Sequence, residues 1–215
     1  MPAILSPHAL TTLEAVKEEL EIDTGDLSKD NYLTRLINSA SDAIERYCDR
    51  HFEKASLIEK VAGQGSQWVL LSRAPILSVT SVTLSGSVLA SSEYEVEEEA
   101  GMLFRASGWP WSAMRRPDIV QDPYPGSETK NIEVAYTGGY VLPKDEDLTA
   151  NPPVVRTLPY DLEEACIATV KTWFRAKGAD LNRTSRRLMD VGDTWDRRAL
   201  PEPVKDMLAP WRRIA

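Results

Sequence analysis

The chain has one kind of hydrophobic pattern at its ends and another in its middle. Apolar residues recur every three or four positions through 11–21, 30–50 and 159–177, which predicts three helices that each bury one face. From about residue 52 apolar and polar residues alternate, which predicts short strands separated by Gly, Ser and Pro. The sequence therefore predicts an α+β fold: a small helical bundle built from the N- and C-terminal segments, with an inserted antiparallel β domain.

The helix at 159–177 is the one around which we expect the core to form. Asp161 and Glu164 have the spacing of a capping box at its start, and Gly178 suits the position after its end. A Trp and a Phe on its apolar stripe require a large apolar surface, which the helix at 30–50 offers. The predicted core residues of this helix are Leu162, Cys166, Val170, Trp173 and Phe174.

The first helix is expected to begin with a second capping box, formed by Thr11 and Glu14. The polar turn after this helix contains Asp23, Asp26 and Asp30. Their spacing is not that of a calcium-binding loop, and the closing Glu of such a loop is missing. We therefore interpret the turn as a linker.

The β segment contains short turns and one long irregular loop. Gly86-Ser87 and Ala100-Gly101 are expected hairpin turns. The loop at 105–128 contains four prolines together with Trp109 and Trp111, and long loops of this kind are usually functional or mobile. The expected partition is 1–51 for the N-terminal helices, 52–150 for the β insertion with the Pro/Trp loop, 151–180 for the central helix, and 181–215 for a basic C-terminal arm with a short helix.

Charge is distributed unevenly along the chain. Residues 1–174 contain 15 Lys and Arg against 27 Asp and Glu, residues 175–215 contain 10 against 6, and the net charge of the chain is −8. An acidic body disfavours binding to nucleic acid, because that binding neutralises phosphates with cations. A basic end on an acidic body indicates an acidic protein partner or a neighbouring copy of the chain; the alternative is a solvated end without a partner.

The end of the chain is predicted to be a short helix anchored by Val204, Met207 and Leu208 and terminated by Pro210. Trp211 follows, flanked by Arg, which is a composition enriched at interface hot spots. Trp211 either protrudes toward a partner or folds back to cap the core, and the sequence leaves both interpretations open.

The sequence contains no pattern of catalytic or metal-binding residues. Nucleophile-elbow, P-loop, dinucleotide-binding and H-E-x-x-H motifs are absent, and neither His8 nor His51 has a convincing partner. Cys48 and Cys166 lie on apolar helix stripes and are expected to be buried, reduced thiols. We expect no enzymatic activity, no cofactor and no metal. No apolar run approaches the roughly 18 residues that would span a bilayer, so we expect no membrane partner.

Six segments in order resemble the head-to-tail connector (adaptor, or head completion) proteins of tailed bacteriophages. They are LTTLEAVKEELEID, YLTRLINSASDAIERYCDRHF, RAPILSVTSVTLSG with SEYEVEEEAGML, IEVAYTGGY, LPYDLEEACIATVKTWF and LPEPVKDMLAPWR. Together they cover most of the chain, whereas 105–128 and 179–198 are not matched.

The resemblance implies a structural subunit that assembles as a ring, a dodecamer, beneath the portal, extends the DNA channel and docks the next tail component. The implied partners are the portal protein, identical subunits, a tail-side stopper or tail completion protein, and passing double-stranded DNA without sequence-specific binding. The implied location is the virion, after assembly in the host cytoplasm. Charge and resemblance together nominate these contacts with the portal or a neighbouring subunit: Arg183, Arg186, Arg187, Arg197, Arg198, Trp211, Arg212 and Arg213.

A function of another class stays open. In this alternative, Trp109 and Trp111 form an aromatic platform of a non-catalytic carbohydrate- or peptide-binding module. The plainer interpretation of the same loop is an interface or a plug in the core.

Overall fold

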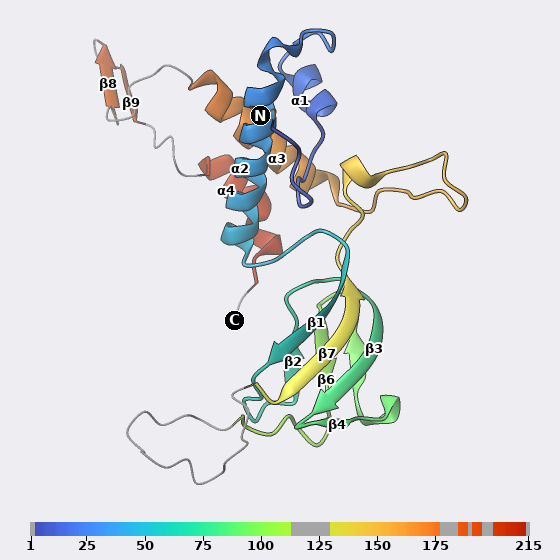
Figure 1. Cartoon of the computed structure of the whole chain (residues 1–215). Coiled ribbons are helices and arrows are strands. Elements are labelled where there is room, and N and C mark those ends of the chain that lie inside the picture. The colour runs from blue at the N-terminus through green and yellow to red at the C-terminus, as the bar shows by residue number, and fades with distance from the viewer. Residues whose placement is uncertain (1–2, 113–129, 177–184, 189–190, 195–199, 214–215) are drawn as a thin grey trace. The chain divides into compact units, whose positions relative to one another are not determined.

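The computed structural model describes residues 3–112, 130–176, 185–188, 191–194 and 200–213. The chain divides into two compact units (Figure 1): a helical unit of Met1–Arg50 with Val141–Ala215, and a β unit of His51–Tyr140. The predicted α+β fold, with a bundle made from both ends of the chain and an antiparallel β insertion between them, is confirmed. Residues 141–150, which the expected partition assigned to the β insertion, belong to the helical unit.

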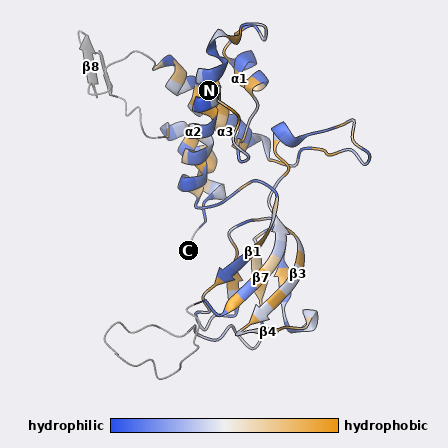
Figure 2. Cartoon of the chain, viewed as in Figure 1, coloured by the Kyte–Doolittle hydropathy of each residue, from blue (hydrophilic) through white to orange (hydrophobic). Residues whose placement is uncertain are grey.

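The core of the helical unit lies between its two longest helices. Its elements are α1 (Leu13–Glu19), η1 (Leu27–Lys29), α2 (Asp30–Cys48), η3 (Pro143–Asp145), α3 (Tyr160–Arg175), α4 (Glu202–Leu208) and η4 (Ala209–Trp211). Helix α2 packs against α3, and α1 and α4 pack against α3 as well. Both long helices show alternating apolar and polar stripes in Figure 2. The fully buried residues of α2 are Leu33, Ile37, Ala40, Ile44 and Cys48.

Both predicted capping boxes are wrong. Helix α1 is capped by Thr12, whose Oγ1 accepts a hydrogen bond from the Ala15 amide at 3.2 Å, while Thr11 is buried and donates to Glu163. Helix α3 follows Pro159 without a side-chain cap, because Asp161 accepts from the adjacent Leu162 amide. The expected residue after α3, Gly178, lies outside the described residues.

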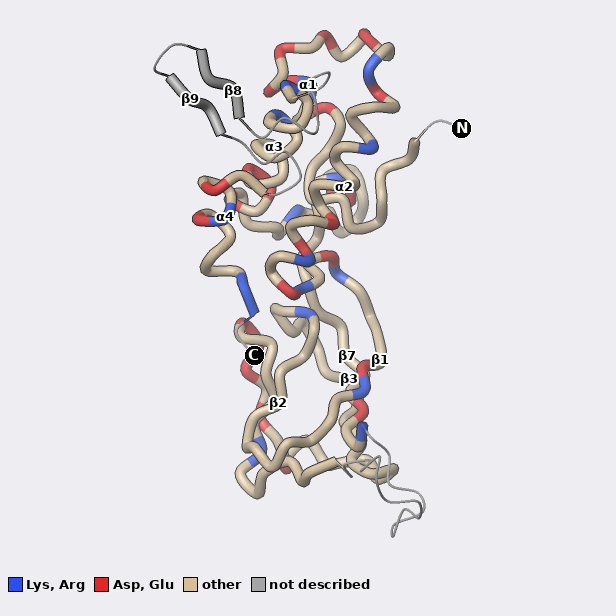
Figure 3. The backbone as a smooth tube through the Cα atoms, turned by 90° about the vertical axis from the view of Figure 1, so that its left-hand side faces the viewer, with Lys and Arg blue, Asp and Glu red and all other residues tan. Residues whose placement is uncertain are grey.

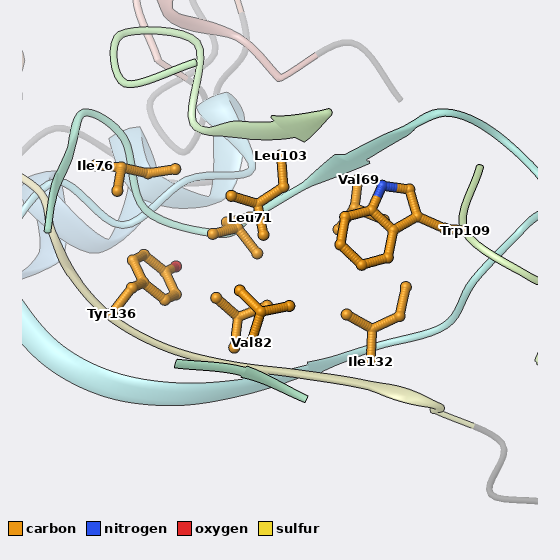
Figure 4. Packing of buried hydrophobic residues seen from close by; sticks show 9 residues of the cluster. Val69, Leu71, Ile76, Val82, Leu103, Trp109, Ile132 and Tyr136 are labelled. Carbon is orange, nitrogen blue, oxygen red and sulfur yellow. The ribbon is translucent and has the colours of Figure 1, made fainter. Parts of the chain in front are cut away.

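The β unit contains two antiparallel sheets. The first has the order β1-β7-β3-β4 and the second the order β2-β6-β5. The strands are β1 (Ala55–Val61), β2 (Trp68–Leu70), β3 (Ile76–Leu84), β4 (Ser87–Val88), β5 (Glu95–Glu97), β6 (Met102–Phe104) and β7 (Ile132–Gly138), with η2 (Ser91–Glu93) before β5. Buried side chains from both sheets form one core cluster (Figure 4).

Two turns of the β unit require residues that tolerate a positive φ. Ser85 and Gly86 both have φ above zero between β3 and β4, as a two-residue hairpin turn demands, so this turn begins one residue before the predicted Gly86-Ser87. Gly101 has φ +69° in the turn between β5 and β6, where a Cβ atom would lie 2.7 Å from that of Ala74. The predicted turn at Ala100-Gly101 is confirmed.

Within the basic C-terminal part, β8 (Ser185–Leu188) and β9 (Val191–Thr194) pair as an antiparallel hairpin. None of the described helices combines the length and hydrophobicity needed to cross a bilayer.

Candidate functional site

Trp109 belongs to the core of the β unit. Its side chain is fully buried beside Val69 and Ile132 (Figure 4). The indole N–H donates to the Gln67 carbonyl oxygen at 3.1 Å, and the Arg105 guanidinium lies 5.8 Å from the ring centroid. The prediction that Trp109 offers its ring at an interface is therefore wrong, and the core-plug interpretation describes it.

Trp111, two residues later, has the opposite environment. Its side chain is 71% exposed. It lies against Gly65, where the indole Nε1 is 2.3 Å from the position that a Cβ atom would take. The loop thus presents Trp111 alone of the predicted pair, and an aromatic platform made of both rings does not exist.

A hydrogen-bonded carboxylate, Glu59 on β1, also ties the first sheet to the segment between β2 and β3. The hydroxyl of Tyr136, on β7, donates to Glu59 Oε2 at 2.7 Å and accepts from the Arg73 amide at 3.1 Å. The same Glu59 oxygen accepts from the Ser72 amide at 2.9 Å. Burial raises the pKa of Tyr136 to about 12.

The C-terminal segment 200–213 folds back on the helical unit. Val204 and Leu208 are buried, and the Trp211 indole N–H donates to Asp161 Oδ2 on α3 at 2.8 Å. The Arg213 amide donates to the Cys48 carbonyl oxygen at the end of α2, at 2.8 Å. Of the two interpretations of Trp211, the structure shows the one that folds back.

The arginines of this segment, Arg212 and Arg213, stand at its end, where the tube next to the C-terminus is blue in Figure 3. Arg212 is exposed, and its guanidinium lies 5.0 Å from the centroid of the Tyr47 ring. Arg186 and Arg187 lie on β8, where their register partners on β9 are Asp193 and Gly192. Three further predicted contacts, Arg183, Arg197 and Arg198, lie outside the described residues.

The predicted stripe of α3 is only partly buried. Leu162, Cys166 and Val170 have no exposed surface. Trp173 and Phe174 are half-buried, and the Phe174 ring packs against that of Tyr32 with centroids 6.0 Å apart. The core of the helical unit therefore ends about one turn earlier than predicted.

A buried ion pair in the helical unit has no signal in the local sequence pattern. Glu163 is 9% exposed; it accepts from Thr11 Oγ1 at 3.2 Å and pairs with the Arg156 guanidinium. That guanidinium also donates to the Leu158 carbonyl oxygen at 3.0 Å and stacks 4.3 Å from the Tyr160 ring centroid. Thr11 and Glu163 are 152 positions apart, so no local pattern reveals their contact.

A buried lysine organises the turn between α1 and α2, where Figure 3 shows a concentration of acidic residues. The Lys17 side chain is 3% exposed, and its Nζ lies 2.5 Å from Asp30 Oδ1. The ammonium also donates to the carbonyl oxygens of Thr24 at 3.1 Å and Asp26 at 3.0 Å. The turn is thus folded around an internal ammonium group.

His8 has a partner that the sequence did not reveal: its Nε2 lies 2.7 Å from Asp42 Oδ1. Ser6 Oγ lies 3.0 Å from both ring nitrogens of His8, so it is not in line with the lone pair of either nitrogen. In a catalytic triad the nucleophile and the carboxylate bind opposite nitrogens. The cluster instead fastens the N-terminal segment to α2, together with the hydrogen bond from the Ser6 amide to Asn38 Oδ1.

The two thiols are buried and free, as predicted. Burial raises the pKa of Cys48 to about 11 and that of Cys166 to about 12, which makes both poor nucleophiles at neutral pH. Among the side chains that the structure describes, no group of His, Cys, Asp and Glu could hold a metal ion.

Comparison with known proteins gives a family and a fold. The family model described as head completion protein matches residues 9–214. A chain from the neck of a native gene transfer agent particle, computed with C12 symmetry, has a TM-score of 0.53 at 14% identity, over 99% of this chain and 93% of that chain. A chain from the neck of an empty particle, computed with C6 symmetry, gives 0.55 at 15%, over 100% and 95%. A chain from the virion of a native gene transfer agent particle gives 0.55 at 15%, over 99% and 94%.

No sequence among the curated proteins matches this chain. The solved structures, at 14–15% identity, show that the fold is shared along the whole chain. The family model spans both the helical unit and the β unit. The chain therefore belongs to the head completion protein family, whose members are structural proteins of the head-to-tail connection.

Proposed function

We propose that this protein is a connector subunit that forms a ring under the portal, extends the DNA channel and docks the next tail component. The observation that carries the proposal is the family match over residues 9–214. It is supported by the fold shared with chains from necks computed with C12 and C6 symmetry. The ring places the protein in the virion after assembly in the host cytoplasm, and no catalytic step is part of the proposal.

The charge of the chain suits a conduit for DNA. A net charge of −8 disfavours retention of a polyanion, because stable binding to DNA requires cations that displace its counterions. Double-stranded DNA is then a passing cargo that is bound without sequence specificity.

The arginines of residues 181–215 are the proposed contacts with the portal or with a neighbouring subunit. Val204 and Leu208 belong to the core, so deleting the C-terminal segment 200–213 would damage the fold as well as the contact. Neutralising the arginines that precede α4 leaves these anchors in place. The residues to replace with Gln are Arg183, Arg186, Arg187, Arg197 and Arg198.

The test of the ring is the mass and shape of the purified protein, measured by light scattering and negative-stain microscopy with and without the cognate portal. Rings of about twelve copies in either sample are expected if the ring closes on a twelve-fold portal. A strict monomer that ignores the portal would overturn the proposal.

The test of the arginine contacts is the affinity of the five-Gln variant for the portal. Because each exposed cation adds to the attraction between oppositely charged surfaces, we expect weaker binding and a smaller dependence on salt concentration. The matched control replaces five exposed cationic residues elsewhere with Gln, namely Lys29, Lys54, Lys60, Lys130 and Arg175, and should bind as the wild type does. Equal affinities of the two variants for the portal would show that the arginines are not part of the interface.

The alternative function, a carbohydrate- or peptide-binding module, loses its main support in the structure. Its platform requires two exposed rings, and Trp109 is fully buried.

A further inference from the structure

One loop of the helical unit lies apart from its helices. Residues 143–157, which we call the 143–157 loop, leave the unit after Leu142 and return to it at Leu158; both flanking leucines are buried. In Figure 1 the loop extends away from the helices as a long gold and yellow hairpin. Between positions 145 and 155 every residue except Ala150 is exposed.

The loop is nevertheless held in one conformation by its own hydrogen bonds. The amides of Asp147 and Val154 donate to each other's carbonyl oxygens at 2.8 Å. Asp147 Oδ1 accepts from the amide of Thr149 at 2.9 Å and from its hydroxyl at 2.7 Å, and these bonds lower the pKa of Asp147. A loop that is ordered before binding loses little conformational entropy when it docks.

Its base is fastened to the helical unit. The amides of Thr157 and Leu158 both donate to the Val141 carbonyl oxygen, at 3.1 Å and 3.2 Å. The Arg156 amide donates to Glu146 Oε1 at 3.2 Å, and the Arg156 guanidinium pairs with the buried Glu163 of α3. The buried ion pair therefore positions the loop.

The loop exposes apolar side chains that a monomer has no reason to hold in water. Leu148 is 67% exposed, Val155 53% and Val154 39%. Figure 2 shows hydrophobic stretches within this loop. Apolar side chains presented on an ordered projection are typical of a contact surface.

The same loop is acidic, and a complementary surface exists on this chain. Residues 144–147 contain one lysine and three acids; the lysine, Lys144, is paired with Asp145 at 2.6 Å, and the other two acids are Glu146 and Asp147. The exposed stripe of α2 contains Asn31, Arg35, Ser39, Asp42 and Arg46, and its one acid, Asp42, is paired with His8. Two arginines therefore flank the small Ser39, and close by lies Ile4, which is 83% exposed and whose carbonyl accepts from Asn38.

We propose that the 143–157 loop docks on the exposed stripe of α2 in a neighbouring copy of this chain. Leu148 and the two valines would cover the surface around Ser39 and Ile4, and Glu146 and Asp147 would face Arg35 and Arg46. Donor and acceptor surfaces differ, so the contact is heterologous and can repeat around a ring. The inference rests on the proposed ring and names a contact that holds it together.

A cross-link between introduced cysteines tests the contact directly. The variant carries Leu148→Cys and Ser39→Cys, two exposed positions, and is treated with a short bismaleimide in the assembled sample. The native thiols are buried and should not react. We expect a ladder of dimers, trimers and higher species on a denaturing gel, because each chain offers both surfaces.

The controls are the two single-cysteine variants and a double variant with Val88→Cys and Ser39→Cys, since Val88 is an equally exposed apolar residue of the β unit. None of them should give the ladder. Rings without the Leu148–Ser39 ladder would overturn this inference and leave the proposed function standing. A ladder from assemblies that never close into rings would support the contact and contradict the ring.

Charge exchange gives a second, independent readout. Arg46→Glu should weaken self-association at least tenfold in sedimentation experiments, and adding Glu146→Lys should restore most of it. Leu148→Asp should weaken it as well, whereas Leu27→Asp, at a side chain that is 71% exposed, should not. Unchanged association in Leu148→Asp would show that the loop faces something other than a second copy.

Discussion

Replacing Lys17 with Met is expected to destabilise the helical unit strongly, although the change keeps the length and the apolar stem of the side chain. The stem is buried along the helix, and only the ammonium is lost. That group is 3% exposed beside Asp30 and donates to the carbonyl oxygens of Thr24 and Asp26.

The expected loss of stability follows from the three oxygen atoms that the Lys17 ammonium contacts. A hydrogen bond from a charged donor contributes roughly 1.5–3 kcal/mol, and an acceptor left buried without a partner costs a similar amount. Asp30 Oδ1, the atom that faces Lys17, is buried, but the Asp30 side chain as a whole is 26% exposed, so a small movement can bring the carboxylate to water. We therefore expect the free energy of unfolding to fall by about 2–4 kcal/mol.

The assay is urea unfolding followed by circular dichroism at the helix band, because the change lies in the helical unit. The matched control is Lys205→Met on α4, whose Nζ lies 2.6 Å from a Glu202 side chain that is 81% exposed. Pairs in water contribute little, so this control should change the free energy of unfolding by less than about 0.5 kcal/mol.

Equal losses in the two variants would refute the reasoning. They would mean that solvent satisfies the carbonyl oxygens of the turn as well as Lys17 does. Hydrogen exchange of the amides between Thr24 and Asp30 gives a local check, since these should lose protection in Lys17→Met and keep it in Lys205→Met.

Three further outcomes are expected. Trp109→Ala should lower the free energy of unfolding of the β unit by about 3–5 kcal/mol and Trp111→Ala by less than about 0.5 kcal/mol; similar urea midpoints for both would contradict the burial of Trp109. The pKa values of Cys48 and Cys166, about 11 and about 12, lie above the roughly 8.5 of an unfolded thiol. The two neutral thiols therefore contribute fully to the free energy of unfolding below about pH 8.5. This contribution is lost as the pH rises toward the pKa values of the folded state, by at most about 1.4 kcal/mol per pH unit for each thiol. Urea midpoints between pH 8.5 and 10.5 should thus fall more steeply in the wild type than in Cys166→Ala, and parallel curves would contradict the shift. In a spectrophotometric titration Tyr136, whose pKa is about 12, should ionise later than an ordinary tyrosine near pH 10, and Tyr136→Phe should remove that late step alone.

Long periodic segments were predicted well, because many positions report the same buried face. The predicted helix at 30–50 is α2, Asp30–Cys48, since its apolar stripe runs through five turns. Cap residues were predicted poorly. Thr11 fits the local capping-box pattern better than Thr12, because Glu14 stands three residues after Thr11 and Ala15 three residues after Thr12. Thr12 is nevertheless the cap, and Thr11 binds the distant Glu163.

Side-chain environments that depend on tertiary contacts could not be predicted from the sequence. Trp109 and Trp111 flank one proline and look alike, yet one is fully buried and the other is 71% exposed. Likewise, Glu163 and Glu164 are adjacent, but only the first meets Arg156. The partner of the Trp109 indole, Gln67, is 42 positions away. Arg156 is only seven positions before Glu163, but it precedes the helix, so the helical pattern does not include it.

The insertion of the β unit also imposes an order in time. The contact between Ser41 on α2 and Cys166 on α3 joins residues 125 positions apart, and the whole β unit is encoded between them. At a synthesis rate of about 5–20 residues per second, about 6–25 seconds pass between the synthesis of Ser41 and that of Cys166. During this time α3 is not available to cover the apolar face of α2. The β unit can fold during that interval, so in the cell the inserted part is expected to be complete before the part that encloses it.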